Sequence, residues 1–306
     1  MTNADGTVTW RQLHAEAVGH LIDAGVGDAD QCAIDARRII ERASGFDGTE
    51  YVLGLDEAAT ERSVHYFDLM VGRRSTGEPL QYVVGSWGFR SLDLLVDSRV
   101  LIPRPETESV AGWAIAELER LRPMATGAGR RLLAADLGTG SGAIGLSIAT
   151  ECSRVDVWMT DESADAVAVA QANLTGIGGA GTSVRIAAGS WFAALPPELA
   201  STIDVIVSNP PYVADGDELP PVVRDWEPGS ALFSGDDGLD DLRVIVAQAP
   251  DWLHESGSLV LEMAPTQVDA VAAMARDAGF IEVEIRSDLA GRQRGIVARL
   301  VPAVKG

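Results

Sequence analysis

Ala135-Asp136-Leu137-Gly138-Thr139-Gly140-Ser141-Gly142 is the stretch of sequence that decides the fold, and it begins in the apolar run of residues 132–135. Glycines let a backbone turn tightly and come close to a bound ligand. In open α/β sheets, ligands bind in the crevice beyond the carboxyl ends of the strands. The stretch therefore predicts a buried strand that ends in a ligand-binding loop.

Outward from this loop, predicted strands and helices alternate. We predict strands at residues 131–136, 155–160, 184–188, 204–208, 258–262, 280–285 and 295–300. We predict helices at residues 107–121, 142–149, 164–174, 239–252 and 267–278, with loops at 126–130 and 176–181. This alternation predicts an α/β fold, a mostly parallel seven-stranded sheet covered on both faces. The last two strands lie close in sequence, which predicts that one of them runs antiparallel.

The chain before this region divides into two parts. Residues 9–74 carry apolar side chains at helical spacing, with glycines marking turns, and predict a small helical bundle. The stretch QYVVGSWGFRSLDLLVDSRVLIP (residues 81–103) contains short β-rich runs typical of a hairpin. We therefore divide the chain into a helical domain at 1–76, a β-hairpin linker at 77–105 and an α/β domain at 106–306.

Composition excludes several classes of protein. The 306 residues are 46% hydrophobic and 23% charged, close to the average for a globular protein. The formal net charge of −21 repels phosphate groups, which argues against a dominant nucleic-acid or anionic-membrane surface. Two cysteines, Cys32 and Cys152, form neither a disulfide framework nor a zinc set, and no metal site is expected. With no signal peptide and no apolar run of about 18 residues, we expect a cytoplasmic protein.

A second acidic residue points to a nucleoside cofactor. Asp161 ends the predicted strand after the glycine loop, where its carboxylate can accept hydrogen bonds from ribose hydroxyls. The segment Gly140-Ser141-Gly142-Ala143-Ile144-Gly145 also fits the G-x-G-x-x-G dinucleotide fingerprint, so this region alone leaves NAD and S-adenosylmethionine open. The leading Asp136 and the D-x-G-x-G-x-G spacing resemble class I methyltransferases, which favours S-adenosylmethionine.

Asn209-Pro210-Pro211-Tyr212 follows the predicted strand at 204–208 and carries the chemistry. The two prolines make the backbone rigid. The amide oxygen of Asn209 and the carbonyl of Pro210 can accept both hydrogens of a planar amino group, on which the ring of Tyr212 can stack. Such acceptors orient the nitrogen and stabilise positive charge that develops as a methyl group arrives. We therefore predict Asn209, Pro210 and Tyr212 as catalytic residues of a methyltransferase, an arrangement that an NAD dehydrogenase does not need.

Further motifs separate methylation of nucleic-acid bases from methylation of glutamine. Together with the Asn-Pro-Pro-Tyr segment they resemble the release factor glutamine methyltransferase family (PrmC or HemK) over nearly the whole chain. These motifs are Gly77–Tyr82 (GEPLQY), Trp87-Gly88-Phe89, Leu101–Glu108 (LIPRPETE), Ser190-Trp191-Phe192 and Glu227-Pro228 through Ala231-Leu232.

The resemblance implies a class I methyltransferase domain that uses S-adenosylmethionine. It implies methylation of the side-chain nitrogen (N5) of the glutamine in the Gly-Gly-Gln motif of class I peptide-chain release factors, with the helical domain docking that substrate. It implies that Asp161 binds the ribose and Trp191 flanks the adenine. The implied cofactor-binding residues are Gly138, Thr139, Gly140, Ser141, Gly142, Asp161, Trp191 and Asn209. The implied substrate-binding residues are Asn209, Pro210, Pro211, Tyr212, Arg104 and Glu106. We expect a monomer that binds neither nucleic acid nor membrane.

Three departures from the family pattern keep alternatives open. Ser190 stands where the family usually has an acid, Ala264-Pro265 replaces the end of a usual Glu-x-Gly, and residues 292–295 replace an acid-rich turn. A glutamine methyltransferase for a ribosomal protein, or a paralogue acting on another amide, is the alternative. A DNA or RNA amino-methyltransferase and a cofactor-binding protein without catalysis are less favoured, the former because of the negative charge.

Overall fold

The chain forms two compact units in a computed structural model that describes residues 7–301. The first unit contains the chain up to Ser86 together with Pro220–Trp226, and the second contains Trp87–Leu219 together with the chain from Glu227 onward. Each unit has its own hydrophobic core.

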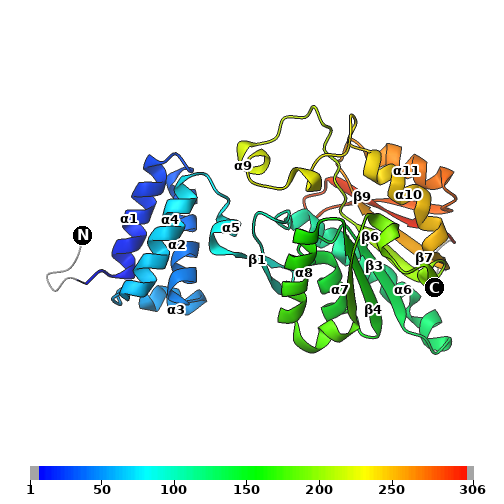
Figure 1. Cartoon of the computed structure of the whole chain (residues 1–306), viewed down its shortest axis with the longest axis horizontal. Helices are drawn as coiled ribbons and strands as arrows, with labels where there is room; N and C mark the ends of the chain where they lie inside the picture. The colour runs from blue at the N-terminus through cyan, green and yellow to red at the C-terminus, as the bar shows by residue number, and fades with distance from the viewer. Residues whose placement is uncertain (1–6, 302–306) are drawn as a thin grey trace. The chain divides into compact units, whose positions relative to one another are not determined.

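The first unit is helical, as the sequence predicts. Its helices are α1 (Trp10–Asp23), α2 (Ala29–Ser44), α3 (Gly48–Gly54), α4 (Glu61–Ser75), α5 (Leu80–Val84) and α9 (Pro221–Arg224). The side chains of Thr9, Asp28 and Thr60 each accept a hydrogen bond from a backbone N–H in the first turn of α1, α2 and α4, which is the usual way to begin a helix. These three helices lie side by side in Figure 1, and apolar side chains from each of them contribute to the core of the bundle.

The β-hairpin in the structure is shorter than the β-rich stretch from which it was predicted. Residues 81–84, the start of the stretch predicted as β-rich, belong instead to helix α5, which follows Pro79 and ends at Gly85 with a left-handed φ of 73°. The two-stranded sheet that remains consists of β1 (Ser86–Phe89) and β2 (Leu92–Leu95).

The second unit is built on a seven-stranded sheet, which confirms the predicted fold class. The strands are β3 (Leu132–Leu137), β4 (Val155–Asp161), β5 (Val184–Ala188), β6 (Ile203–Ser208), β7 (Leu253–Glu262), β8 (Glu282–Ser287) and β9 (Gln293–Arg299). Their order is β5-β4-β3-β6-β7-β9-β8. Strands β3 to β7 pair in parallel, whereas β9 runs antiparallel to both β7 and β8. The last strand is therefore the antiparallel one.

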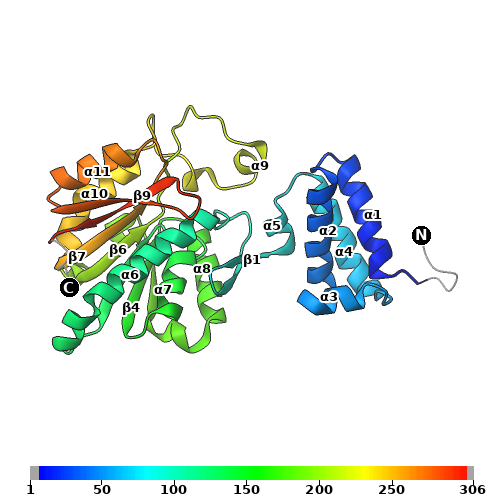
Figure 2. The same cartoon turned by 180° about the vertical axis from the view of Figure 1, so that it is seen from behind.

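Helices cover both faces of this sheet (Figures 1 and 2). One face carries α6 (Pro105–Gly127), α7 (Ala143–Glu151) and α8 (Ala164–Gly176), and the other carries α10 (Asp240–Trp252) and α11 (Val268–Asp277). Short 3-10 turns lie at η1 (Gly178–Ser183), η2 (Trp191–Ala194), η3 (Pro197–Leu199) and η4 (Gly229–Ala231). Within residues 7–301, none of the helices combines the length and apolar character needed to cross a membrane.

Helix α6 is longer than predicted at its C-terminal end. The loop predicted at residues 126–130 begins only after Gly127, because Leu121 and Ala125 lie one turn apart and are both buried. That burial outweighs the poor helix propensity of Thr126 and Gly127. The left-handed φ of 69° at Gly129 then allows the chain to leave the helix.

The register between β3 and β6 brings the two chemical motifs together. Leu137 at the end of β3 pairs with Ser208 at the end of β6. The Ser208 hydroxyl donates a hydrogen bond of 2.6 Å to the Leu137 carbonyl and ties these ends to each other. The next residues are Gly138 and Asn209, so the glycine loop and the Asn-Pro-Pro-Tyr segment begin side by side. This is the point where the strand order reverses, the usual ligand site of such sheets.

A buried ionic cluster joins α6 to the sheet. The Glu117 carboxylate accepts hydrogen bonds from Arg299 on β9, Ser258 on β7 and Arg120 on its own helix. Burial acts to raise the pKa of Glu117, but these three hydrogen bonds outweigh it and lower the pKa to about 2. Arg299 is only 3% exposed and also pairs with Glu284 and Glu282, so removal of the Glu117 carboxylate takes away one of its three anionic partners.

Glu117→Gln should therefore destabilise the protein. We expect the free energy of unfolding to fall by about 1–3 kcal/mol, because Arg299 keeps Glu284 and Glu282 while its buried N–H groups lose a charged acceptor. Urea unfolding followed by circular dichroism measures the change. Glu119→Gln is the matched control, because Glu119 lies on the same helix but its side chain is 51% exposed in its pair with Arg122. That variant should unfold at nearly the wild-type urea concentration.

The same cluster predicts a pH dependence of stability. Because the folded-state pKa of Glu117 is about 2 against an ordinary value of 4.5, its contribution is present above pH 4.5 and is lost as the pH falls toward 2. Wild-type stability should therefore fall more steeply over this interval than that of Glu117→Gln. Identical slopes in urea titrations of the two proteins would contradict the assignment.

Candidate active site

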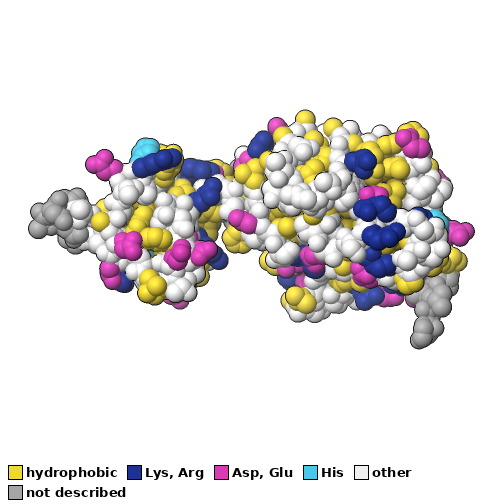
Figure 3. Space-filling model, turned by 90° about the horizontal axis from the view of Figure 1, so that it is seen from below, with side chains coloured by type: hydrophobic (Ala, Val, Ile, Leu, Met, Phe, Trp, Pro, Cys, Tyr) yellow, Lys and Arg dark blue, Asp and Glu magenta, His cyan; other side chains and the backbone are white. Residues whose placement is uncertain are grey.

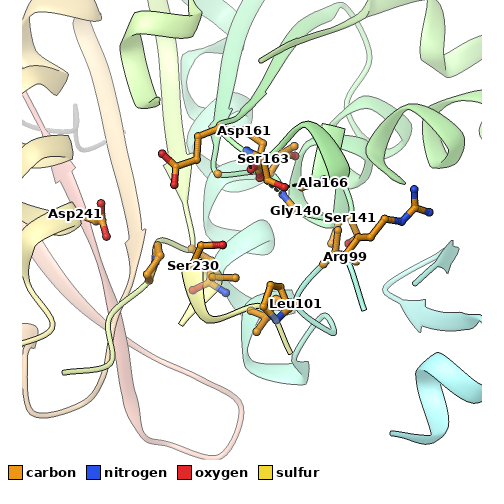
Figure 4. A pocket seen from close by; sticks show the side chains of 18 of the residues that line it. Arg99, Leu101, Gly140, Ser141, Asp161, Ser163, Ala166, Ser230 and Asp241 are labelled. Carbon is orange, nitrogen blue, oxygen red and sulfur yellow. Dashed lines mark hydrogen bonds between the residues drawn. The ribbon is translucent and has the colours of Figure 1, made fainter. Parts of the chain in front are cut away.

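A cavity of about 250 Å³ lies in the second unit, beyond the carboxyl ends of β3, β4, β5 and β6. In Figure 4, Asp161, Ser163 and Gly140 lie near one another, whereas Ser230 and Asp241 line the side opposite Arg99 and Ser141. Of the residues singled out from the sequence, the cavity is lined by Gly138, Thr139, Gly140, Ser141, Asp161, Ser190, Trp191, Asn209 and Pro211. Most of the predicted site is thus gathered in one place.

The glycine loop depends on left-handed backbone at three positions. The φ angles of Gly138, Gly140 and Gly142 are 68°, 55° and 88°, values that side-chain-bearing residues rarely adopt. A Cβ atom at Gly142 would lie 2.9 Å from the side-chain ends of Leu146 and Met159, so those two side chains would have to shift to admit it. A Cβ at Gly140 would meet no atom within 4 Å, which leaves its backbone open to a ligand.

Asp136 holds the glycine loop from beneath. Its buried carboxylate accepts hydrogen bonds from the Thr139 hydroxyl at 2.6 Å and the Gly145 N–H at 2.9 Å. Burial raises the pKa of Asp136 to about 6, although both hydrogen bonds act to lower it. Its atom Oδ1 has no hydrogen-bond partner among the described residues. Asp136 therefore orders the loop but does not itself line the cavity.

Asp161 faces the cavity from the end of β4. One carboxylate oxygen accepts a hydrogen bond from the Gly140 N–H at 2.9 Å, and the other accepts one from the Ser163 N–H at 2.9 Å (Figure 4). Burial raises the pKa of Asp161, and the two backbone donors moderate that effect. Each oxygen keeps a lone pair with which it can accept a further hydrogen bond.

Trp191 closes the cavity beside the glycine loop. Its own φ is 45°, an uncommon value for an aromatic residue, and it follows Ser190 at the start of η2. The indole ring lies against Gly138, since a Cβ there would come within 3.1 Å of the ring. An aromatic side chain thus lines the cavity, and its role beside an adenine stays a prediction.

The Asn209 side chain is fixed at the cavity wall by Thr107. Its Nδ2 donates a hydrogen bond of 3.3 Å to Thr107 Oγ1, so its Oδ1 points away from Thr107. Both residues line the cavity. Thr107 belongs to the LIPRPETE motif, but nothing in the sequence alone connects it with Asn209, 102 residues further on.

The rest of the Asn-Pro-Pro-Tyr segment is held by the loop after β7. Gln267 Nε2 donates to the Tyr212 carbonyl at 2.9 Å, and the Ala264 N–H donates to Gln267 Oε1 at 3.1 Å. Gly238 is also needed, because a Cβ there would lie 2.4 Å from the Tyr212 carbonyl oxygen. The unusual Ala264-Pro265 segment therefore belongs to a loop that supports Tyr212.

Several predicted residues stand near the cavity but are not among its lining residues. They are Gly142, Pro210, Tyr212, Arg104 and Glu106. Arg104 donates a 2.6 Å hydrogen bond to the buried Glu227, which also accepts from the Ile102 N–H. Glu106 accepts a 2.7 Å hydrogen bond from Arg292. Both charges are thus paired within the protein, and their roles toward a substrate stay predictions.

A buried carboxyl that the sequence did not single out lies behind this wall. Glu262, the last residue of β7, is 1% exposed, and its Oε1 lies 3.4 Å from the Tyr212 hydroxyl. Burial raises the pKa of Glu262 to about 7, and hydrogen bonding from Thr107 and Tyr212 and the charge of Arg294 oppose that shift. Only the packing of β6, β7 and α6 brings these groups together.

These features fit S-adenosylmethionine. Asp161 offers acceptor positions for hydroxyl groups, Trp191 and Ile144 offer apolar surface, and Gly140 leaves backbone accessible. Asp161, Glu162 and Asp241 also line the cavity, and acidic side chains favour a ligand that carries positive charge. The sheet with its antiparallel last strand, the glycine loop and Asp161 define a class I S-adenosylmethionine-dependent methyltransferase.

Comparison with known proteins identifies the family. A model described as the PrmC N-terminal domain matches residues 12–85, and one described as the methyltransferase small domain matches residues 121–225. A protein named release factor glutamine methyltransferase from Cereibacter sphaeroides is 37% identical over 94% of this chain and 97% of its own length. One of the same name from Xylella fastidiosa is 42% identical over 80% of this chain and 83% of its own. The chain belongs to the release factor glutamine methyltransferase family.

Solved structures share the fold at much lower identity. The catalytic domain of hMettl16, in complex with MAT2A 3′UTR hairpin 1, superposes with a TM-score of 0.52 at 16% identity. The match covers 75% of this chain and 79% of that domain. This likeness establishes the methyltransferase fold and nothing about the substrate.

Asp161→Ala should weaken cofactor binding. The variant loses the acceptors that face the cavity and also releases the Gly140 N–H, so we expect the affinity for S-adenosylmethionine to fall roughly 10- to 100-fold. Isothermal titration calorimetry measures it. Asp156→Ala is the matched control, because Asp156 is on the same strand and pairs with Arg131 outside the cavity. Equal affinities for the two variants would contradict the role of Asp161.

Proposed function

We propose that this protein transfers a methyl group from S-adenosylmethionine to N5 of the glutamine in the Gly-Gly-Gln motif of class I peptide-chain release factors. Membership of the release factor glutamine methyltransferase family supports the reaction and the substrate class. The observation that carries the chemistry is the hydrogen bond from Asn209 Nδ2 to Thr107. Because the amide nitrogen is engaged there, the amide oxygen is left to accept a hydrogen bond from a substrate.

The cofactor-binding residues divide into three groups in this proposal. Residues Gly138 to Gly142 wrap around the methionine and ribose parts of the cofactor. Asp161 accepts hydrogen bonds from the ribose hydroxyls, and Trp191 provides the flat surface beside the adenine. When bound, S-adenosylmethionine would supply a methyl group on a positively charged sulfur. A nucleophile that attacks the methyl carbon displaces the sulfur, which leaves as a neutral thioether.

The Asn-Pro-Pro-Tyr segment positions the nucleophile. A glutamine amide nitrogen is a poor nucleophile, because its lone pair is delocalised into the carbonyl. Asn209 Oδ1 and the Pro210 carbonyl accept both of its hydrogens and hold the nitrogen about 3–3.5 Å from the carbon it attacks, a near-attack geometry. The same oxygens stabilise the positive charge that develops on the nitrogen. Tyr212 stacks on the planar amide, Pro211 shapes the wall, and the surplus proton leaves to water.

We assign docking of the protein substrate to the helical domain, residues 1–76 in our division. Large hydrophobic side chains are exposed on its helices, which supports contact with a protein partner. They are Ile34, Val52, Leu53, Tyr66 and Leu69. The linker at 77–105 and the methyltransferase domain at 106–306 complete the division.

The charge distribution supports a protein substrate over a nucleic acid. The net charge is −21, and Figure 3 shows basic side chains of the second unit next to acidic ones on the face that is seen. Within the second unit, Arg122, Arg131 and Arg243 each form an ion pair with a carboxylate. Pairing of this kind lowers the positive potential that a phosphate backbone needs.

A methyl-transfer assay tests the proposal. The protein is mixed with labelled S-adenosylmethionine and an unmethylated class I release factor, and the product is digested and mapped by mass spectrometry. We expect one added methyl group on the Gly-Gly-Gln glutamine. If the cofactor binds but the release factor stays unmodified, the substrate assignment is wrong and the fold assignment stands.

Asn209→Ala should separate catalysis from cofactor binding. Loss of one of the two acceptors should lower kcat by about 100-fold or more, as removal of a charge-stabilising group does in other enzymes. The dissociation constant of S-adenosylmethionine, measured by calorimetry, should stay near the wild-type value. Gln171→Ala, which removes an exposed amide on α8, is the control and should leave turnover unchanged. A wild-type methylation rate in Asn209→Ala would refute the assigned role.

A further inference from the structure

The buried carboxyl of Glu262 ends a short chain of hydrogen bonds that begins at the cavity. The Tyr212 hydroxyl lies 3.4 Å from Glu262 Oε1, and hydrogen bonding from the Thr107 hydroxyl acts to lower the pKa of the same carboxyl. Its other oxygen, Oε2, has no hydrogen-bond partner within residues 7–301. Thr107, in turn, accepts the hydrogen bond from Asn209 Nδ2 at 3.3 Å. Glu262 is thus connected to Asn209 through one hydroxyl group.

The chemistry of the three groups gives this chain a direction. A carboxylate can only accept hydrogen bonds, whereas a hydroxyl donates one hydrogen and accepts others. When Glu262 is ionised, the Thr107 hydrogen points toward it, and the lone pairs of Thr107 face Asn209. Asn209 must then present its NH2 group to Thr107, which leaves its oxygen for the substrate.

We propose that Glu262 is a positioning residue that sets which end of the Asn209 side-chain amide faces the substrate. The effect of this orientation on catalysis rests on the proposed function, because an amide substrate offers two hydrogens and requires an acceptor. It concerns a residue outside the Asn-Pro-Pro-Tyr segment, which acts through Thr107 and touches neither substrate nor cofactor.

The opposite direction of the chain is unproductive. A neutral side chain at position 262, either a protonated Glu262 or a glutamine, can donate a hydrogen bond to Thr107. The Thr107 hydrogen then points toward Asn209, whose amide turns to present its oxygen to Thr107 and its NH2 group to the cavity. Two NH2 groups would then face each other, and the substrate amide would lose an acceptor, which lowers kcat roughly 10- to 100-fold.

The surroundings of Glu262 place this change near neutral pH. Burial raises its pKa to about 7, against the opposing effects of the Thr107 and Tyr212 hydroxyls and of Arg294 on β9, while the charge of Glu106 on α6 raises it further. These are the charged and titratable groups that face the carboxyl from α6, β9 and the segment after β6. The productive direction is favoured above this pKa and is lost as the pH falls through it.

Nuclear magnetic resonance tests the inference without any methylation assay. The side-chain NH2 signals of Asn209 are assigned in ¹⁵N-labelled protein by their loss in Asn209→Ala, and are then followed from pH 5 to 9. We expect a shift with a midpoint near pH 7 in the wild type and a constant position in Glu262→Gln. A wild-type signal that does not titrate, or one that titrates equally in Glu262→Gln, would overturn the proposal even if the release factor is methylated.

Kinetics of the full-length protein supply the second test. Glu262→Gln should lower kcat 10- to 100-fold, leave the dissociation constant of S-adenosylmethionine unchanged, and abolish the fall in kcat at acid pH. Thr107→Val, of nearly equal shape, should lower kcat to a similar extent, and Thr107→Ser should recover most of the loss. Glu119→Gln serves as the matched control for the loss of a carboxylate.

The two Thr107 variants keep the inference testable if Glu262→Gln does not fold. Wild-type kcat in Thr107→Val would overturn the proposal, as would an acid limb retained in Glu262→Gln. If the wild type itself does not methylate the release factor, the proposed function fails, and the resonance of Asn209 still decides the role of Glu262.

Discussion

The pairing of β3 with β6 is the constraint on which the rest of the site depends. Their ends are fixed by the register of Leu137 with Ser208 and by the hydrogen bond from the Ser208 hydroxyl to the Leu137 carbonyl. The glycine loop leaves one strand and the Asn-Pro-Pro-Tyr segment leaves the other, so the groups assigned to the cofactor and to the substrate amide begin as neighbours. Because side chains alternate between the faces of a strand, a slip by one residue would turn them to opposite faces and separate the two groups.

Buried polar groups give the site its order. Asp136 holds the glycine loop, Asp161 binds two backbone N–H groups beside the cavity, and Glu262 stands behind Tyr212. Burial raises the pKa of each of these carboxyls, which means that the fold holds them at a cost in free energy. Glu117, by contrast, has three donors and a lowered pKa, as befits a group that only stabilises the fold. The direction of the pKa shift thus separates the three carboxyls near the cavity from the structural carboxyl of Glu117.

The strands and the fold class could be predicted from the sequence because buried parallel strands are continuous apolar runs bounded by turn residues. In two other segments, neighbouring residues or burial determined a secondary structure that differs from the one predicted from the residue pattern. Residues 81–84 are rich in β-formers, yet Pro79 and Gly85 delimit a helix, and the end of α6 is stabilised by burial of Ala125. Motifs within one stretch, such as Asn209 to Tyr212, could be found in the sequence. The contact of Asn209 with Thr107 and the position of Glu262 behind Tyr212 could not, because tertiary packing alone brings residues so far apart in the sequence into contact.

The central claim is that Asn209 and Pro210 present a glutamine amide to a cofactor bound beside the glycine loop. A crystal structure of the protein with S-adenosylhomocysteine, the demethylated cofactor, and a peptide containing Gly-Gly-Gln tests it most directly. The account predicts the ribose on Asp161, the adenine beside Trp191, and the glutamine NH2 group within hydrogen-bond distance of Asn209 Oδ1 and the Pro210 carbonyl oxygen. A glutamine side chain bound away from Asn209, or an Asn209 amide whose NH2 group faces it, would contradict the account.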